Sequence, residues 1–237
     1  MEAESEPVGA EIDRIEREYQ RREQEVCPDL YQIWQPEVLL TVNARRRVAA
    51  RMLYEAGVFP KAGDACLEVG FGFLGWLGDL IVWGMRETDL HGMELNPQRT
   101  KRAKEILPLA DLRQGDATSL PWESNSFRLV IASTLFTSIL DDGVRRLIAD
   151  EITRVLAPGG ALLWYDFAVN NPKNSQVRRV ARSEIRQLFP RLRGRIQSTT
   201  LAPPLARLLA RRSWALAVLL EMIPLLRTHL LAVLVKS

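Results

Sequence analysis

The sequence predicts a doubly wound α/β protein built on a parallel sheet of seven strands. Short apolar runs alternate with segments of helical periodicity, and this alternation is typical of right-handed βαβ units. Glycines and prolines separate many of these runs, as expected for the turns between strands and helices. We expect strands near residues 65–69, 90–94, 110–114, 127–132, 161–167, 195–200 and 228–235.

The most informative segment follows the first of these strands. An apolar run ends at Glu68, and Gly70, Gly72 and Gly75 follow in G-x-G-x-x-G spacing. Such glycines allow a sharp strand-to-helix turn and let a ligand approach the backbone closely. The helix that comes next presents unpaired N–H groups to a polar or anionic group. Alone, the spacing fits a nucleotide-type ligand and a merely tight turn equally well.

The second strand also ends in an acid. Glu94 follows Gly75 by 19 residues, close to the spacing of about 20 at which a carboxylate binds ribose hydroxyls in dinucleotide-binding folds. Asn96 and Pro97 then favour the start of a helix, as its N-cap and its first residue. The pattern therefore indicates a ligand that carries a ribose.

Five segments in order resemble the class I S-adenosylmethionine-dependent methyltransferases with a type 11 methyltransferase domain: E-V-G-F-G, G-M-E-L-N-P, G-D-A-T-S-L-P-W, S-F-R-L-V-I-A-S and R-V-L-A-P-G-G. The match covers residues 65–167. It implies a Rossmann-like, mostly parallel sheet with an antiparallel edge strand, and S-adenosylmethionine as cosubstrate without a metal. A dehydrogenase is excluded, because nothing like a nicotinamide-side loop accompanies Glu94. The chain departs from the family at Phe71 and Leu74, where smaller residues are frequent.

The resemblance also implies roles for single residues. Glu68 would orient the methionine amino group of the donor, and the backbone of the first two loop glycines would border its methionine portion. Glu94 would bind both ribose hydroxyls. The residues expected to bind the cosubstrate are Glu68, Gly70, Gly72, Gly75, Glu94, Leu95, Asp116, Ala117 and Ser133, with Asp116 and Ala117 at the adenine edge.

The acceptor side has weaker signals. Asp166 ends the fifth strand, so it is a candidate base or acceptor ligand, and His229 is a second candidate base because its pKa ordinarily lies near neutrality. Two asparagines after the fifth strand offer hydrogen bonds, and two N-terminal aromatic residues either form a lid or simply cap the sheet. The expected substrate contacts are Tyr31, Trp34, Asn170 and Asn171.

We expect two regions, a helical cap over residues 1–60 and a methyltransferase domain over 61–237 with its core at 65–167. A helical insertion at 205–227 precedes the last strand and has leucines at i, i+3 and i+4 spacing. Its longest uncharged run is eight residues, far below the roughly 20 that span a bilayer. The insertion either packs as a cap or lies on a membrane surface. Further helices are expected at residues 10–22, 38–56 and 176–188.

The net charge of +3 conceals an asymmetry, because residues 173–237 hold 13 Lys and Arg against two Asp and Glu. Such a basic region is typical of binding to nucleic acid, anionic membranes or anionic substrates, and also of a solvated helix surface. Aromatic residues do not interleave with its arginines as they do in a stacking platform, which disfavours nucleic acid. Two cysteines are too few for a disulfide framework, and the first residues are acidic and polar. We therefore expect a cytoplasmic protein, with peripheral contact to a membrane left open.

The sequence thus predicts methyl transfer from S-adenosylmethionine to a small-molecule, glycan or lipid-linked acceptor, at oxygen. An anionic acceptor is expected, with Arg207, Arg211 and Arg212 of the insertion as its contacts. The region after the fifth strand resembles a bacterial methyltransferase subgroup found with sugar and polysaccharide biosynthesis genes.

Two alternatives stand beside this function. One is a catalytically silent binding subunit of the same fold, in which the bulky Phe71, Phe73 and Leu74 fill the methionine pocket. The other is an RNA methyltransferase, which rests only on the basic C-terminal region.

Overall fold

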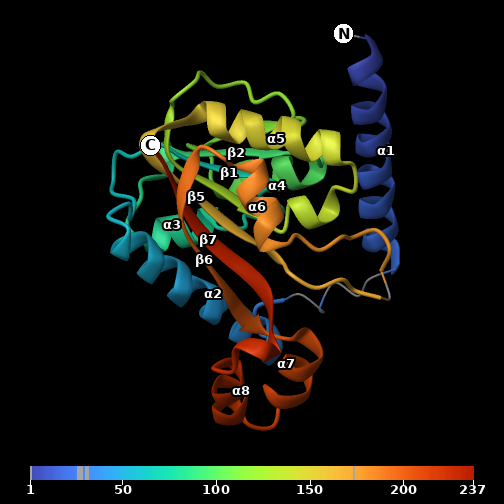
Figure 1. Ribbon diagram of the computed structural model, residues 1–237, viewed down its shortest axis with the longest axis vertical. Coiled ribbons are helices and arrows are strands. Elements are labelled where there is room, and N and C mark those ends of the chain that lie inside the picture. Colours follow the sequence, from blue (N-terminus) through green and yellow to red (C-terminus); the bar gives the residue numbers. More distant parts are fainter. Residues whose placement is uncertain (1, 26–28, 30–31, 173) are drawn as a thin grey trace.

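The computed structural model describes residues 2–25, 29, 32–172 and 174–237. Over these residues the chain forms one sheet of seven strands with helices on both faces (Figure 1). The strands are β1 (Cys66–Val69), β2 (Leu90–Glu94), β3 (Asp111–Gln114), β4 (Phe127–Ser133), β5 (Leu156–Phe167), β6 (Leu192–Leu201) and β7 (Arg227–Lys236). The α-helices are α1 (Glu2–Glu25), α2 (Pro36–Glu55), α3 (Leu77–Val82), α4 (Pro97–Ile106), α5 (Asp142–Val155), α6 (Arg182–Leu188), α7 (Pro203–Leu209) and α8 (Trp214–Glu221).

The strand order is β3-β2-β1-β4-β5-β7-β6. The first five of these strands pair in parallel, whereas β7 is antiparallel to both β5 and β6. The predicted sheet, mostly parallel with an antiparallel strand near one edge, is confirmed. The outermost strand is β6, however, and β7 lies one position inside it. Burial explains this order: residues 230–234 of β7 are at most 4% exposed, whereas β6 exposes residues 193–195 and tolerates an edge.

Two apolar cores lie on opposite faces of the sheet. Helices α5 and α6 cover one face, where Ile148, Ile152 and Ile185 pack against strand residues such as Trp164. Helices α2 and α3 cover the other face (Figure 1). A third, small cluster joins α2 to α7 and α8, which project from the body of the molecule. Each buried side chain of Leu or Ile type contributes roughly 1.5–3 kcal/mol, so these cores fix the strand ends that form the site.

Three expected helices differ from the structure. The helix expected over residues 10–22 is longer, because α1 runs from Glu2 to Glu25. The helix expected over residues 176–188 begins only at Arg182, because backbone N–H groups before it bond to other elements: Arg178 to the Thr137 carbonyl at 2.9 Å and Val180 to the Phe167 carbonyl at 2.9 Å. The insertion forms two short helices rather than one continuous segment. No helix in the described part of the chain is long and apolar enough to cross a membrane.

Candidate functional site

The strand order reverses beside β1, which pairs with β2 on one side and with β4 on the other. Open α/β sheets bind ligands at such a point, in the crevice at the carboxyl ends of the strands. The loops after β1 and β4 meet there: a Cβ atom added to Gly70 would lie 3.1 Å from Leu135 Cδ1. The topology therefore brings the glycine loop to the place where a ligand is expected.

Glu68 holds the glycine loop in place through hydrogen bonds to its backbone. Its side chain is 1% exposed, and Oε2 accepts hydrogen bonds from the backbone N–H groups of Trp76 at 2.7 Å and Leu77 at 3.0 Å. Burial raises the pKa of Glu68 well above its usual range, against the opposing effect of these N–H donors and of Arg45. Glu68 thus holds the end of β1 to the start of α3.

Glu94 holds the loop from the neighbouring strand. It is 2% exposed, and its two oxygens accept from the Gly72 N–H at 2.8 Å and the Asn96 N–H at 3.0 Å. The backbone at Gly72 has a φ of +58°, a left-handed conformation that favours glycine. Two backbone donors therefore fix the Glu94 carboxylate at the mouth of the crevice.

A cavity of about 60 Å³ lies at this crevice, and we call it the switch-point cavity. Its wall combines residues from the ends of β1, β2 and β3, from the loop after β4, and from α1 and α5. Of the residues expected to bind a cosubstrate, Gly70, Glu94, Leu95, Asp116 and Ala117 line it. Glu68, Gly72, Gly75 and Ser133 lie outside its lining, and Ser133 is 8% exposed at the end of β4.

Helix α1 closes the cavity from outside. Glu11, Ile12, Ile15 and Tyr19 line it, and the Arg14 guanidinium donates to the Ser138 carbonyl at 2.5 Å. The helix was expected as part of an N-terminal cap, but these four residues were not among the expected site residues, although Ile12, Ile15 and Tyr19 form the apolar stripe of α1. These α1 side chains form one wall of the cavity of about 60 Å³.

A stack of three side chains links α1 to the glycine loop. The Arg99 guanidinium of α4 lies 4.4 Å from the Tyr19 ring centroid and 4.8 Å from that of Phe73. Burial raises the pKa of Tyr19, and the nearby Glu94 carboxylate raises it further. The tyrosine hydroxyl therefore stays neutral beside Glu94.

The bulky loop residues point away from the cavity lining. Phe71 is 1% exposed and packs beneath β2, since a Cβ atom on Gly92 would lie 2.5 Å from its ring. Phe73 is 66% exposed. Leu74 adopts a φ of +84° and packs against the core on the α2 face. None of the three lines the switch-point cavity. These large side chains therefore do not fill the crevice next to β1.

Comparison with known proteins agrees with this geometry. Residues 66–160 match the family model of a methyltransferase domain. The chain is 30% identical over 141 residues to the glycine/sarcosine/dimethylglycine N-methyltransferase of Actinopolyspora halophila, which is 58% of this chain and 24% of that protein. It is 30% identical over 132 residues to the phthiotriol/phenolphthiotriol dimycocerosates methyltransferase of Mycobacterium leprae, 55% of this chain and 47% of that protein. Residues 66–160 of the chain therefore match the class I S-adenosylmethionine-dependent methyltransferases.

Solved structures share the fold of this chain. The PH0226 protein of Pyrococcus horikoshii superimposes with a TM-score of 0.64 at 13% identity, over 93% of this chain and 99% of that one. Geranyl diphosphate C-methyltransferase of Streptomyces coelicolor superimposes with a TM-score of 0.59 at 15% identity, over 81% of this chain and 77% of that one. The curated relatives share only part of their length with this chain, so their acceptors do not transfer to it directly.

Asp166, a candidate base, lies beneath the surface of the protein. It is 1% exposed. Its Oδ2 accepts from the Thr137 N–H at 3.0 Å, and Oδ1 accepts from the Phe167 N–H at 2.9 Å and from the Thr137 hydroxyl. Burial raises the pKa of Asp166 to about 7, against the effect of these N–H donors. The carboxyl ties the loop after β4 to the end of β5, and its catalytic role stays a prediction.

The raised pKa of Asp166 predicts a pH dependence of stability. A carboxyl whose pKa rises on folding stabilises fully below its ordinary pKa of 3.8, and this contribution is lost as the pH rises through about 7. Asparagine at position 166 cannot ionise, so the stability of the Asp166→Asn protein does not contain this pH-dependent contribution. We therefore expect the free energy of unfolding of the wild type, relative to that of Asp166→Asn, to fall as the pH increases from 4 to 8. Urea unfolding of both proteins across this range measures this difference in stability.

The control is Asp150→Asn, at an exposed position on α5. A difference in stability between the wild type and Asp166→Asn that stays constant with pH would contradict the expectation.

His229, the other candidate base, is 4% exposed. Its ring stacks on Tyr165 with centroids 4.8 Å apart, and its Nδ1 lies 2.6 Å from Thr200 Oγ1. Burial lowers the pKa of His229 to about 3. The imidazole therefore stays neutral near pH 7. His229 was a candidate base because a histidine pKa ordinarily lies near neutrality, and this reason does not hold for the buried ring.

Three of the four expected substrate contacts lie at the surface. Trp34 is 64% exposed. Asn170 and Asn171 are exposed, and the Asn170 Oδ1 accepts from the Arg179 N–H at 2.8 Å. Tyr31 lies outside the described residues. Within the described residues, no three His, Cys, Asp or Glu side chains form a group that could hold a metal ion.

Two of the three insertion arginines have hydrogen-bond partners of their own. Arg211, in the turn after α7, donates to Glu37 at 2.9 Å and to Gln35 at 2.8 Å, which ties this turn to the start of α2. Arg212 is exposed and donates to the Leu208 carbonyl at 3.2 Å. Arg207 lies on α7 and is exposed. The ion pair of Arg211 lowers the positive charge that the insertion offers to an acceptor.

Proposed function

We propose that this chain transfers a methyl group from S-adenosylmethionine to a small-molecule or lipid-linked acceptor, at an oxygen atom. The observation that supports it best is the Glu94 carboxylate, fixed beside the glycine loop, with Leu95, Asp116 and Ala117 around one cavity. Glu94 would bind the ribose hydroxyls, and Asp116 with Ala117 would contact the adenine edge. Glu68, one oxygen of which is held by α3, would orient the methionine amino group.

Methyl transfer from a sulfonium is an in-line displacement. A lone pair of the acceptor oxygen forms the new O–C bond, while the electron pair of the C–S bond stays on sulfur and neutralises it. The hydroxyl proton then passes to solvent or to a base. Holding both partners in near-attack geometry supplies much of the rate, and that is the role we assign to the crevice.

A lipid-linked acceptor is supported by the surface of the insertion and by one relative. Seven large apolar residues of residues 205–227 are exposed: Leu208, Trp214, Leu216, Leu219, Met222, Ile223 and Leu225. A concentration of this kind marks an interaction site more often than chance exposure does. The relative from Mycobacterium leprae is named for phthiotriol and phenolphthiotriol dimycocerosates. An acceptor with an apolar portion would contact this surface.

We infer that residues 1–60 form a helical cap and that α1 moves when the donor binds. The switch-point cavity of about 60 Å³ is well below the roughly 300–1,000 Å³ of small-molecule sites. Donor binding would displace Tyr19 and Ile15, which line it. S-adenosylhomocysteine should therefore speed proteolytic cleavage within α1 severalfold without changing cleavage elsewhere. Limited proteolysis with mass spectrometry measures this, and uniform protection of α1 would contradict it.

Two measurements test the function. Calorimetry should detect binding of S-adenosylmethionine and S-adenosylhomocysteine. Transfer of labelled methyl from the donor to soluble and lipid extracts should then identify the acceptor class. Lack of donor binding would favour the silent binding subunit, although the orientation of Phe71 away from the cavity lining disfavours it. Labelling of RNA alone would favour the RNA methyltransferase.

A further inference from the structure

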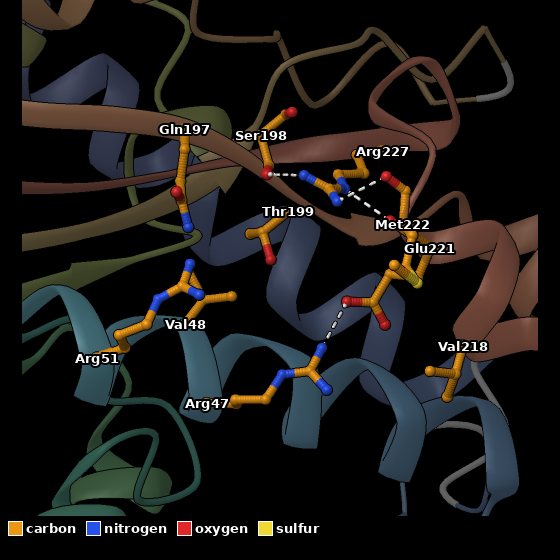
Figure 2. Close-up of a pocket in the computed structure, with 10 residues that line it drawn as sticks. All are labelled: Arg47, Val48, Arg51, Gln197, Ser198, Thr199, Val218, Glu221, Met222 and Arg227. Carbon is orange, nitrogen blue, oxygen red and sulfur yellow. Dashed lines mark hydrogen bonds and ion pairs between the residues drawn. The ribbon is translucent and has the colours of Figure 1, made fainter.

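A larger cavity lies away from the switch point, between α2, β6 and α8, and we call it the edge cavity. Its volume is about 320 Å³, within the roughly 300–1,000 Å³ of small-molecule sites. Figure 2 shows its lining: Arg47, Val48, Arg51, Gln197, Ser198, Thr199, Val218, Glu221, Met222 and Arg227. Strands β4, β5 and β7 separate β6 from β1. At about 4.8 Å per strand, the edge cavity lies on the order of 19 Å from the glycine loop.

Positive charge dominates the wall of the edge cavity. Arg47 and Arg51 stand one turn apart on the same face of α2. Arg227 donates to the carbonyls of Glu221 at 2.6 Å, Met222 at 3.0 Å and Ser198 at 3.2 Å. Such bonds to neutral groups hold a guanidinium in place and leave its charge available.

The acidic partners leave this charge only partly balanced. Glu221 is the one carboxylate in the lining, and its Oε1 lies 3.4 Å from Arg47. Arg51 faces Glu55 at 3.7 Å, with both side chains at least half exposed, a geometry that contributes little. Three guanidinium groups against one lining carboxylate repel a cationic ligand and attract an anionic one.

A buried hydroxyl in the wall also lacks a partner. Thr199 is 2% exposed, and its Oγ1 has no hydrogen-bond partner among the described residues. Leaving such a group unsatisfied costs about 1–3 kcal/mol, a cost that a bound oxygen atom would remove. Figure 2 shows Thr199 and Gln197 above Arg51 and Arg47 around the same space. Threonine, glutamine and arginine side chains together offer hydroxyl, amide and guanidinium donors to one group.

We propose that the edge cavity is a second binding site, distinct from the donor site, for a small molecule that carries a phosphate or carboxylate group. Arg51 and Arg47 bind the anionic group, and Thr199 and Gln197 complete its hydrogen bonds. The apolar Val48, Val218 and Met222 contact the remainder of the molecule. Because α8 belongs to the insertion and β6 to the sheet, the bound molecule bridges the two. The site does not depend on methyl transfer, so a binding assay tests it separately from the proposed function.

The test is the binding of three probes to the full chain: inorganic phosphate, phenyl phosphate and benzoate, each compared with chloride at equal ionic strength. Thermal shift and calorimetry should show stabilisation of the wild type by at least one phosphate probe. Arg51→Gln should weaken that binding about tenfold, the scale of a lost charged hydrogen bond. Thr199→Val should weaken it severalfold, and Thr199→Ser, which keeps the hydroxyl, should restore it.

The control variant is Arg102→Gln, an exposed position on α4 outside the cavity, which should bind each probe as the wild type does. Circular dichroism and urea unfolding show whether each variant is folded, independently of donor binding. If inorganic phosphate binds, the ligand of the site is a free anion. If phenyl phosphate or benzoate binds and inorganic phosphate does not, the ligand is an organic molecule with an anionic group. The proposal is overturned if no probe stabilises the wild type, if Arg51→Gln and Thr199→Val bind as tightly as the wild type, or if a probe competes with S-adenosylhomocysteine.

Discussion

Replacing Glu94 by glutamine is expected to lower the affinity for S-adenosylmethionine about 10- to 100-fold. Glu94 is 2% exposed, and its oxygens already accept from Gly72 and Asn96. A carboxylate can accept further bonds from two ribose hydroxyls, whereas an amide offers a single oxygen. Loss of hydrogen bonds to a charged group corresponds to roughly 1.5–3 kcal/mol. Calorimetric titration with S-adenosylhomocysteine measures the change without turnover.

The control for this experiment is Glu105→Gln, which makes the same chemical change at an exposed position of α4. It should bind the donor like the wild type, because Glu105 does not line the switch-point cavity. Since Glu94 also fixes the glycine loop, circular dichroism and urea unfolding must show that Glu94→Gln is folded. A folded Glu94→Gln protein with unchanged affinity would remove Glu94 from the ribose site.

The sequence predicted where the glycine turn and the two acids next to it lie in the fold, because local patterns determine these positions. Glu68 and Glu94 each end an apolar run, so both were expected at the carboxyl edge of neighbouring strands, and both lie there. Parallel pairing of β1 with β2 follows from the same βαβ pattern. The glycines at positions 70, 72 and 75 were expected in a tight turn, and all three have positive φ.

The acceptor side depends on long-range packing, which the sequence does not display. Asp166 ends a strand as expected, but whether its carboxyl faces solvent is decided by Thr137, 29 residues away, whose N–H and hydroxyl bond to it. Likewise, the place of α1 over the cavity rests on contacts such as that of Arg14 with Ser138, 124 residues along the chain. The pattern of α1 predicted an apolar stripe, but not the surface that this stripe covers.

Replacing Gly75 by alanine should have the largest effect on the loop itself. A Cβ atom at this position would lie 2.1 Å from Oε1 of Glu68, and the backbone φ of +40° is one that L side chains rarely adopt. The buried Glu68 carboxylate would have to move and give up its bonds to Trp76 and Leu77. Positive φ costs roughly 1–2 kcal/mol, and an unsatisfied buried group costs about 1–3 kcal/mol more. We expect Gly75→Ala to lower the free energy of unfolding by about 2–5 kcal/mol.

Gly78→Ala provides a matched control three residues later, inside α3. A Cβ atom at Gly78 meets nothing within 4 Å, and its φ is not positive, so alanine there should stabilise the helix by roughly 0.5–1 kcal/mol. Replacing glycine by alanine is thus expected to lower the free energy of unfolding at position 75 and to raise it at position 78. Urea unfolding of both variants measures the sign, and donor titration of any folded Gly75→Ala protein should show weakened binding. If Gly75→Ala is as stable as the wild type and binds the donor normally, Glu68 does not hold the loop as described, and its part in orienting the methionine group fails with it.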